Sequence, residues 1–126
     1  MMKVCYTGWT WIKSHEPEAA KEQLAQSFKE CKFLGYDYVE NFAFIRDFYK
    51  DNPEELVQLQ KDCGVELVNL YGHFTFDVEE SLRIAKEQVD FLAAVGGQWV
   101  NRQNGGVRAG GPRRRAPPRP AGCPCR

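Results

Sequence analysis

The sequence predicts an α/β fold in which parallel strands alternate with helices. A Gly-x-x-x-Val motif recurs at Gly35, Gly64 and Gly96, at intervals of 29 and 32 residues. Between these motifs, apolar strand-like runs alternate with stretches that have helical spacing. A period of about 30 residues with this alternation is typical of βαβ units, whose strands pair side by side and whose helices cover the sheet.

The first unit is predicted to be a strand at residues 3–11 followed by a helix. The strand ends in Gly8 and two tryptophans, Trp9 and Trp11. Pro17 suits the first turn of the helix because its φ is already helical, and Gly35 is expected just past the helix end. One apolar stripe at spacings of three and four supports the helix: Ala20, Leu24, Phe28, Cys31 and Leu34.

The second and third units repeat this plan. A strand at 36–44, interrupted by Glu40 and Asn41, is followed by a loop at 45–51 and by a helix that Asn52 is expected to cap. The strand at 64–73 is apolar on both faces, which predicts burial on both sides, and it finishes with Gly72-His73. Asp77 is expected to cap the next helix in the same way, and residues 98–101 open a fourth strand. Apolar residues at four-three spacing predict that third helix: Val78, Leu82, Ala85, Val89 and Leu92.

The composition changes abruptly after Asn101. All 17 acidic residues lie between Glu16 and Asp90, whereas residues 102–126 hold seven arginines, no acid and no aromatic residue. A segment so poor in apolar surface cannot offset its ordering entropy. We therefore expect one domain over residues 1–101 and a disordered tail over 102–126. A reading-frame slip is the favoured origin of this tail, ahead of a disordered linker and an evolved basic arm.

With these elements placed, the chain resembles the sugar phosphate isomerase/epimerase family, which has the xylose-isomerase-like TIM barrel. The resemblance rests on the opening strand, on Gly35-Tyr-Asp-Tyr-Val-Glu40 and on a third strand that ends in Gly72-His73. The second of these is similar to the family's Gly-hydrophobic-Asp-x-Val-Glu strand. The resemblance covers residues 1–101 and implies a parallel-stranded partial (β/α)8 TIM barrel of about four βα units.

The resemblance implies a metal-dependent isomerase or epimerase that acts on a sugar, sugar phosphate or polyol through an enediolate. A divalent cation (Mn, Mg, Co or Zn) would stabilise the enediolate while two glutamates move the proton. In the family these groups come from later strands, so no residue here inherits a catalytic or metal-binding role. We expect this chain to be truncated and inactive, with no metal bound.

The resemblance implies substrate contacts at the carboxyl ends of the strands, where parallel sheets bind ligands. Glu40 and His73 are candidates by position, although each could instead be held by hydrogen bonds within the protein. The aromatic candidates could form a wall for a sugar ring or could be barrel packing. The candidate substrate-binding residues are Glu40, His73, Trp9, Trp11 and Tyr71.

Two other functions stay open. A fragment of an endonuclease IV-like repair nuclease would require several histidines at strand ends, and only His73 is placed there. A non-catalytic module could bind nucleic acid through a basic arm, but the acidic body opposes contact with phosphate backbones. The expected partner is therefore a small sugar or polyol, and an open half-barrel could also form a homodimer. No apolar run suits a membrane span or signal peptide, so a cytoplasmic location is expected.

Overall fold

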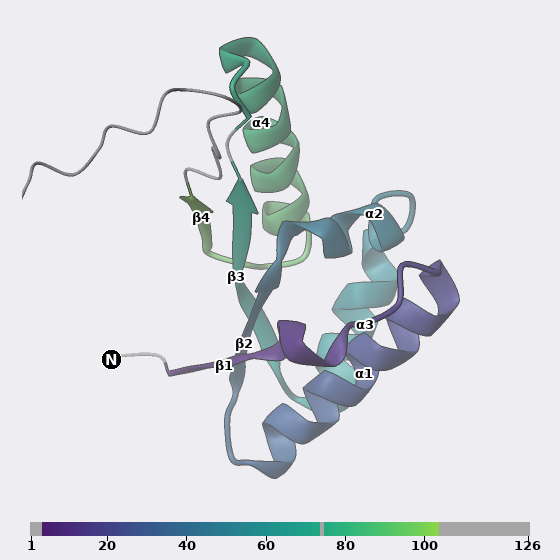
Figure 1. The fold of residues 1–126 in the computed structure, drawn as a ribbon. Coiled ribbons are helices and arrows are strands. Elements are labelled where there is room, and N and C mark those ends of the chain that lie inside the picture. The colour runs from purple at the N-terminus through teal and green to yellow at the C-terminus, as the bar shows by residue number, and fades with distance from the viewer. Residues whose placement is uncertain (1–3, 74, 104–126) are drawn as a thin grey trace, which may run out of the picture.

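The computed structural model describes residues 4–73 and 75–103, which form a sheet with its main helices on one side (Figure 1). The four strands are all parallel and lie in chain order across the sheet. This confirms the predicted parallel α/β arrangement, although four strands in an open sheet do not by themselves make a barrel. The strands are β1 (Cys5–Thr7), β2 (Tyr38–Phe42), β3 (Glu66–His73) and β4 (Trp99–Gln103).

Three long helices connect successive strands, as the repeat predicts. They are α1 (Pro17–Phe33), α3 (Pro53–Cys63) and α4 (Val78–Ala94). Gly35, Gly64 and Gly96 follow them with φ values of 85°, 64° and 84°, in the left-handed region that glycine adopts most easily. Of the helices within the described ranges, none combines the length and apolar character that a membrane span requires.

Three boundaries differ from those expected. The first strand ends at Thr7 because a 3-10 helix, η1 (Gly8–Trp11), follows it. The expected strand at 36–44 ends at Phe42, where η2 (Ala43–Ile45) begins, and α2 (Arg46–Tyr49) forms most of the expected loop at 45–51, since Ile45 and Tyr49 are buried in the core. β4 continues two residues beyond Asn101, because Arg102 pairs with Gly72 and Gln103 pairs with His73. The rest of the expected tail, residues 104–126, lies outside the described residues.

The core lies between the sheet and the helices. Val39, Leu67 and Leu70 face it from the strands and are fully buried. From α1, the predicted stripe meets them through Leu24, Phe28 and Cys31, which are also fully buried. The opposite face of the sheet carries none of the described α-helices, and Trp9 of η1 packs against Phe42 there.

Of the apolar row that predicts helix α4, only Leu92 is buried. Val78, Leu82 and Val89 are 72%, 66% and 52% exposed. A Cβ added at Gly72 would meet the end of the Gln88 side chain, so this glycine leaves the space that the Gln88 amide occupies against β3. The four residues that α4 buries are Ser81, Gln88, Phe91 and Leu92.

Candidate functional site

The face without helices carries side chains in rows that run across the strands. Thr7 pairs with Glu40, and Glu40 pairs with Asn69, which in turn pairs with Trp99. We call these four residues the Glu40 row. Because side chains alternate along a strand, the next row on the same face holds Phe42, Tyr71 and Asn101, and His73 follows one step later on β3.

A shift in register between β2 and β3 creates the Glu40 row. Val39 pairs with Leu67, but Glu40 pairs with Asn69, so Val68 is an extra residue in β3. A bulge of this kind re-aims the side chains that follow it. It places an amide beside Glu40, where an unbroken register would place Val68. Sequence reasoning missed Asn69 because the strand's apolar run gives no signal of the bulge.

The Glu40 carboxylate is held on both sides within its row. Thr7 Oγ1 donates a hydrogen bond to Glu40 Oε1 at 2.8 Å, and Asn69 Nδ2 donates to Oε2 at 3.2 Å. These two bonds compensate for placing a half-buried carboxylate among apolar residues. A carboxylate offers about four lone-pair sites, so Glu40 keeps capacity to accept further hydrogen bonds from a ligand.

Three of the predicted aromatic or titratable residues gather around Phe42. The Phe42 ring centroid lies 5.3 Å from that of Trp9, 6.2 Å from that of Tyr71 and 6.1 Å from that of His73. We call these four residues the aromatic cluster. Phe42 was not among the predicted site residues, although its position two residues beyond Glu40 places it on the same strand face.

Trp11 lies apart from this arrangement. Its indole Nε1 donates a hydrogen bond to the Tyr6 hydroxyl at 3.1 Å. The Tyr6 ring in turn lies tilted against that of Tyr36, with ring centroids 5.9 Å apart, and packs against the core. The structure therefore brings Trp9, Tyr71 and His73 together one step beyond Glu40, and it holds Trp11 at Tyr6 instead.

The described residues do not fit the divalent metal that the resemblance implies. Within residues 4–73 and 75–103, no three His, Cys, Asp or Glu side chains gather as a metal ion would require. The groups that hydrogen-bond the Glu40 carboxylate are a threonine hydroxyl and an amide nitrogen, neither of which completes a set of carboxylate and imidazole ligands. No catalytic step is assigned through a metal here.

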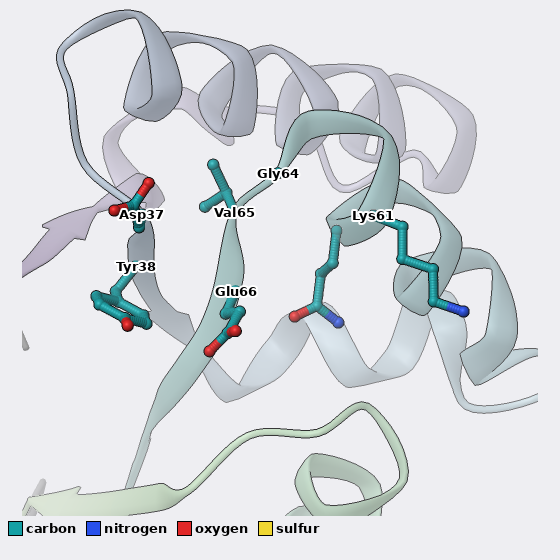
Figure 2. Close-up of a pocket in the computed structure, with 7 residues that line it drawn as sticks. Asp37, Tyr38, Lys61, Gly64, Val65 and Glu66 are labelled. Carbon is teal, nitrogen blue, oxygen red and sulfur yellow. The ribbon is translucent and has the colours of Figure 1, made fainter.

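A hollow of about 450 Å³ lies at the other end of the sheet, where β2 and β3 begin. Figure 2 shows the residues that line it. Asp37 at its wall already pairs with Lys32, Nζ to Oδ1 at 2.6 Å, and this hydrogen bond raises the pKa of Lys32. Parallel α/β proteins bind ligands at the carboxyl ends of their strands, so this hollow is not the favoured site. It is lined by Asp37, Tyr38, Gln60, Lys61, Gly64, Val65 and Glu66.

Comparisons of the chain with protein-family models, with curated proteins and with solved structures found no match in any of the three. The family resemblance in the sequence therefore stays a prediction. The site is argued from its own geometry: a carboxylate held by two donors, next to a cluster of aromatic rings, at the carboxyl ends of parallel strands.

Proposed function

We propose that the described residues belong to a xylose-isomerase-like TIM barrel that binds a sugar or polyol, and that the complete barrel is an isomerase or epimerase. The proposal is carried by one observation: the Glu40 row lies directly beside the aromatic cluster. A sugar ring has an apolar face and a rim of hydroxyl groups. Aromatic rings with fixed hydrogen-bond acceptors next to them complement both features.

The shape of the sheet supports the barrel part of the proposal. Helices cover one face, and the other face carries successive rows of side chains, as the interior of a TIM barrel does. Among the described strands, β1 pairs only with β2, and β4 pairs only with β3. A longer chain, or a second copy in a homodimer, would supply the strands that close the barrel.

The chain's own residues have binding roles in this proposal. Glu40 accepts hydrogen bonds from substrate hydroxyls, and the aromatic cluster packs against the ring and excludes water from one of its faces. No proton transfer is assigned to any described residue, so we expect binding without turnover from this chain. The cytoplasmic location expected from the sequence also stays a prediction.

Sugar binding can be tested by saturation-transfer NMR on the full chain with glucose, xylose and myo-inositol. We expect ring protons of at least one of these compounds to receive saturation from the wild-type protein. The signal should fall strongly in Trp9→Ala, which removes one wall of the aromatic cluster. Phe33→Ala is the matched control, because Phe33 is an 86% exposed aromatic residue at the end of α1.

Two results would contradict the proposed function. One is the absence of saturation transfer to every compound from a wild-type protein whose circular dichroism shows that it is folded. The other is a signal that Trp9→Ala and Phe33→Ala reduce equally, since a nonspecific contact anywhere on the surface would behave in that way.

A further inference from the structure

The Glu40 row contains a buried oxygen that has no hydrogen-bond partner. Asn69 is 5% exposed, and its Oδ1 is buried without a donor. The orientation of the amide follows from its neighbour, because the Glu40 carboxylate only accepts and must therefore receive the Asn69 NH₂ group. Oδ1 is then the atom left over. An unpaired buried acceptor destabilises a protein, so a donor supplied by a ligand would be favourable here.

The polar atoms that this row offers at its centre are acceptors. They are the remaining lone pairs of the Glu40 carboxylate and the Oδ1 atom of Asn69, whereas the Trp99 indole N–H at the edge of the row is a donor. A ligand complements such a row by offering hydroxyl hydrogens. A phosphate group at pH 7 offers acceptor oxygens and negative charge instead, so it would be repelled by Glu40.

Two described cations near the strand ends are engaged elsewhere. Arg102 lies on the opposite face from Asn101, where its guanidinium donates to Gln88 Oε1 at 2.7 Å and to the carbonyl oxygen of His73. Arg46 on α2 pairs with Glu87 at 2.7 Å. Within the described ranges, the strands place no lysine or arginine on the face that carries the Glu40 row.

We propose that this site selects neutral sugars or polyols with adjacent hydroxyl groups and discriminates against their phosphates. One hydroxyl donates to Asn69 Oδ1 and its neighbour donates to the Glu40 carboxylate. Because Asn69 Oδ1 is buried, a neighbouring side chain has to move to admit the first hydroxyl, and the half-exposed Trp99 is the neighbour of Asn69 on β4. This inference rests on the proposed function and narrows its substrate class.

The experiment compares myo-inositol with inositol 1-phosphate, and glucose with glucose 6-phosphate, by calorimetric titration of the full chain. Each neutral compound is expected to bind at least about tenfold more tightly than its phosphate. Asn69→Leu, which has a similar volume but no polar atoms, should weaken binding of the neutral compounds by about tenfold, because the site would then leave a ligand hydroxyl unpaired. Gln26→Leu on the exposed surface of α1 is the control and should change neither affinity.

The outcomes separate this inference from the proposed function. Phosphates that bind as tightly as their neutral counterparts would overturn the inference and leave sugar binding intact. Binding of neither class would overturn both proposals. If a folded Asn69→Leu variant binds the neutral compounds with unchanged affinity, Asn69 does not contact the ligand and its proposed role is wrong. If that variant fails to fold, the comparison of the two ligand classes on the wild-type protein decides the question.

Discussion

Helices α1 and α4 each contain 17 residues and carry a similar apolar spacing, yet they bury their predicted apolar rows to different extents. α1 buries its apolar stripe, including Leu24 and Phe28, except for Leu34 just past the helix end, which is half exposed. α4 buries Ser81 and Gln88 and leaves Leu82 and Val89 largely exposed. An apolar spacing therefore predicts that a segment is helical more reliably than it predicts which side of the helix is buried.

The position of each helix in the sheet explains the difference. α1 contacts β2 and packs beside α2 and α3, so its stripe is covered from several directions. α4 contacts β3 and β4, and β4 is the last described strand. In the proposed barrel, the exposed row of α4 is the surface that a helix beyond β4 would cover.

The largest expected effect is the difference in stability between alanine substitutions in the buried stripe of α1 and in the exposed row of α4. Leu24→Ala should lower the free energy of unfolding by about 3 kcal/mol, because it opens a cavity in a fully buried part of the core. Leu82→Ala makes the same chemical change at a site that is mostly in water, so it should cost less than about 0.5 kcal/mol. Urea unfolding of both variants measures the difference. Equal losses of unfolding free energy in the two variants would show that the exposed row of α4 is covered in solution. The proposed difference between the two helices would then be wrong.

A smaller effect concerns how the helices begin. The Asp77 side chain accepts a hydrogen bond from the Glu80 backbone N–H at 2.8 Å, as expected for the cap of α4. Asn52 occupies the same position before α3 but makes no such bond; its amide donates to the Glu55 carboxylate instead. Asp77→Ala should therefore cost about 1 kcal/mol of unfolding free energy.

Asn52→Ala is the matched variant at the start of α3. Because no side-chain cap is lost there, its cost should be clearly smaller than that of Asp77→Ala when both are followed by thermal unfolding at pH 7. A cost for Asn52→Ala that equals or exceeds the Asp77→Ala value would show that the two helices begin in the same way, as the sequence suggests.

The smallest expected effect on stability at neutral pH concerns Tyr49, which is buried beside α1. Burial raises the pKa of Tyr49 on α2 to about 12, and the Glu55 and Glu18 carboxylates add to the shift. A raised folded-state pKa contributes stability that is complete below the unfolded value of about 10 and is lost as the pH rises toward 12. Between pH 7 and pH 11, the free energy of unfolding should therefore decrease less in Tyr49→Phe than in the wild type. An equal decrease in the free energy of unfolding in both proteins would show that ionisation of Tyr49 does not cause the loss of stability at high pH.

Much of the framework was predictable because it depends on local chemistry. Proline and glycine restrict or release φ, so Pro17, Pro53 and the glycines Gly35, Gly64 and Gly96 mark where helices begin and end. Glu40 and His73 were expected at the strand ends, and β2 and β3 place them on the same face of the parallel sheet. Whether they bind substrate stays a prediction.

The order of strands and helices could be predicted from spacing and turn chemistry along the chain, because these signals are local. Contacts in the folded protein instead place Asn69 beside Glu40, put Phe42 at the centre of the aromatic cluster and bury Gln88 of α4. These features depend on a one-residue bulge and on the packing of α4 against β3. Both are set by contacts between segments far apart in sequence, and local periodicity carries no information about them.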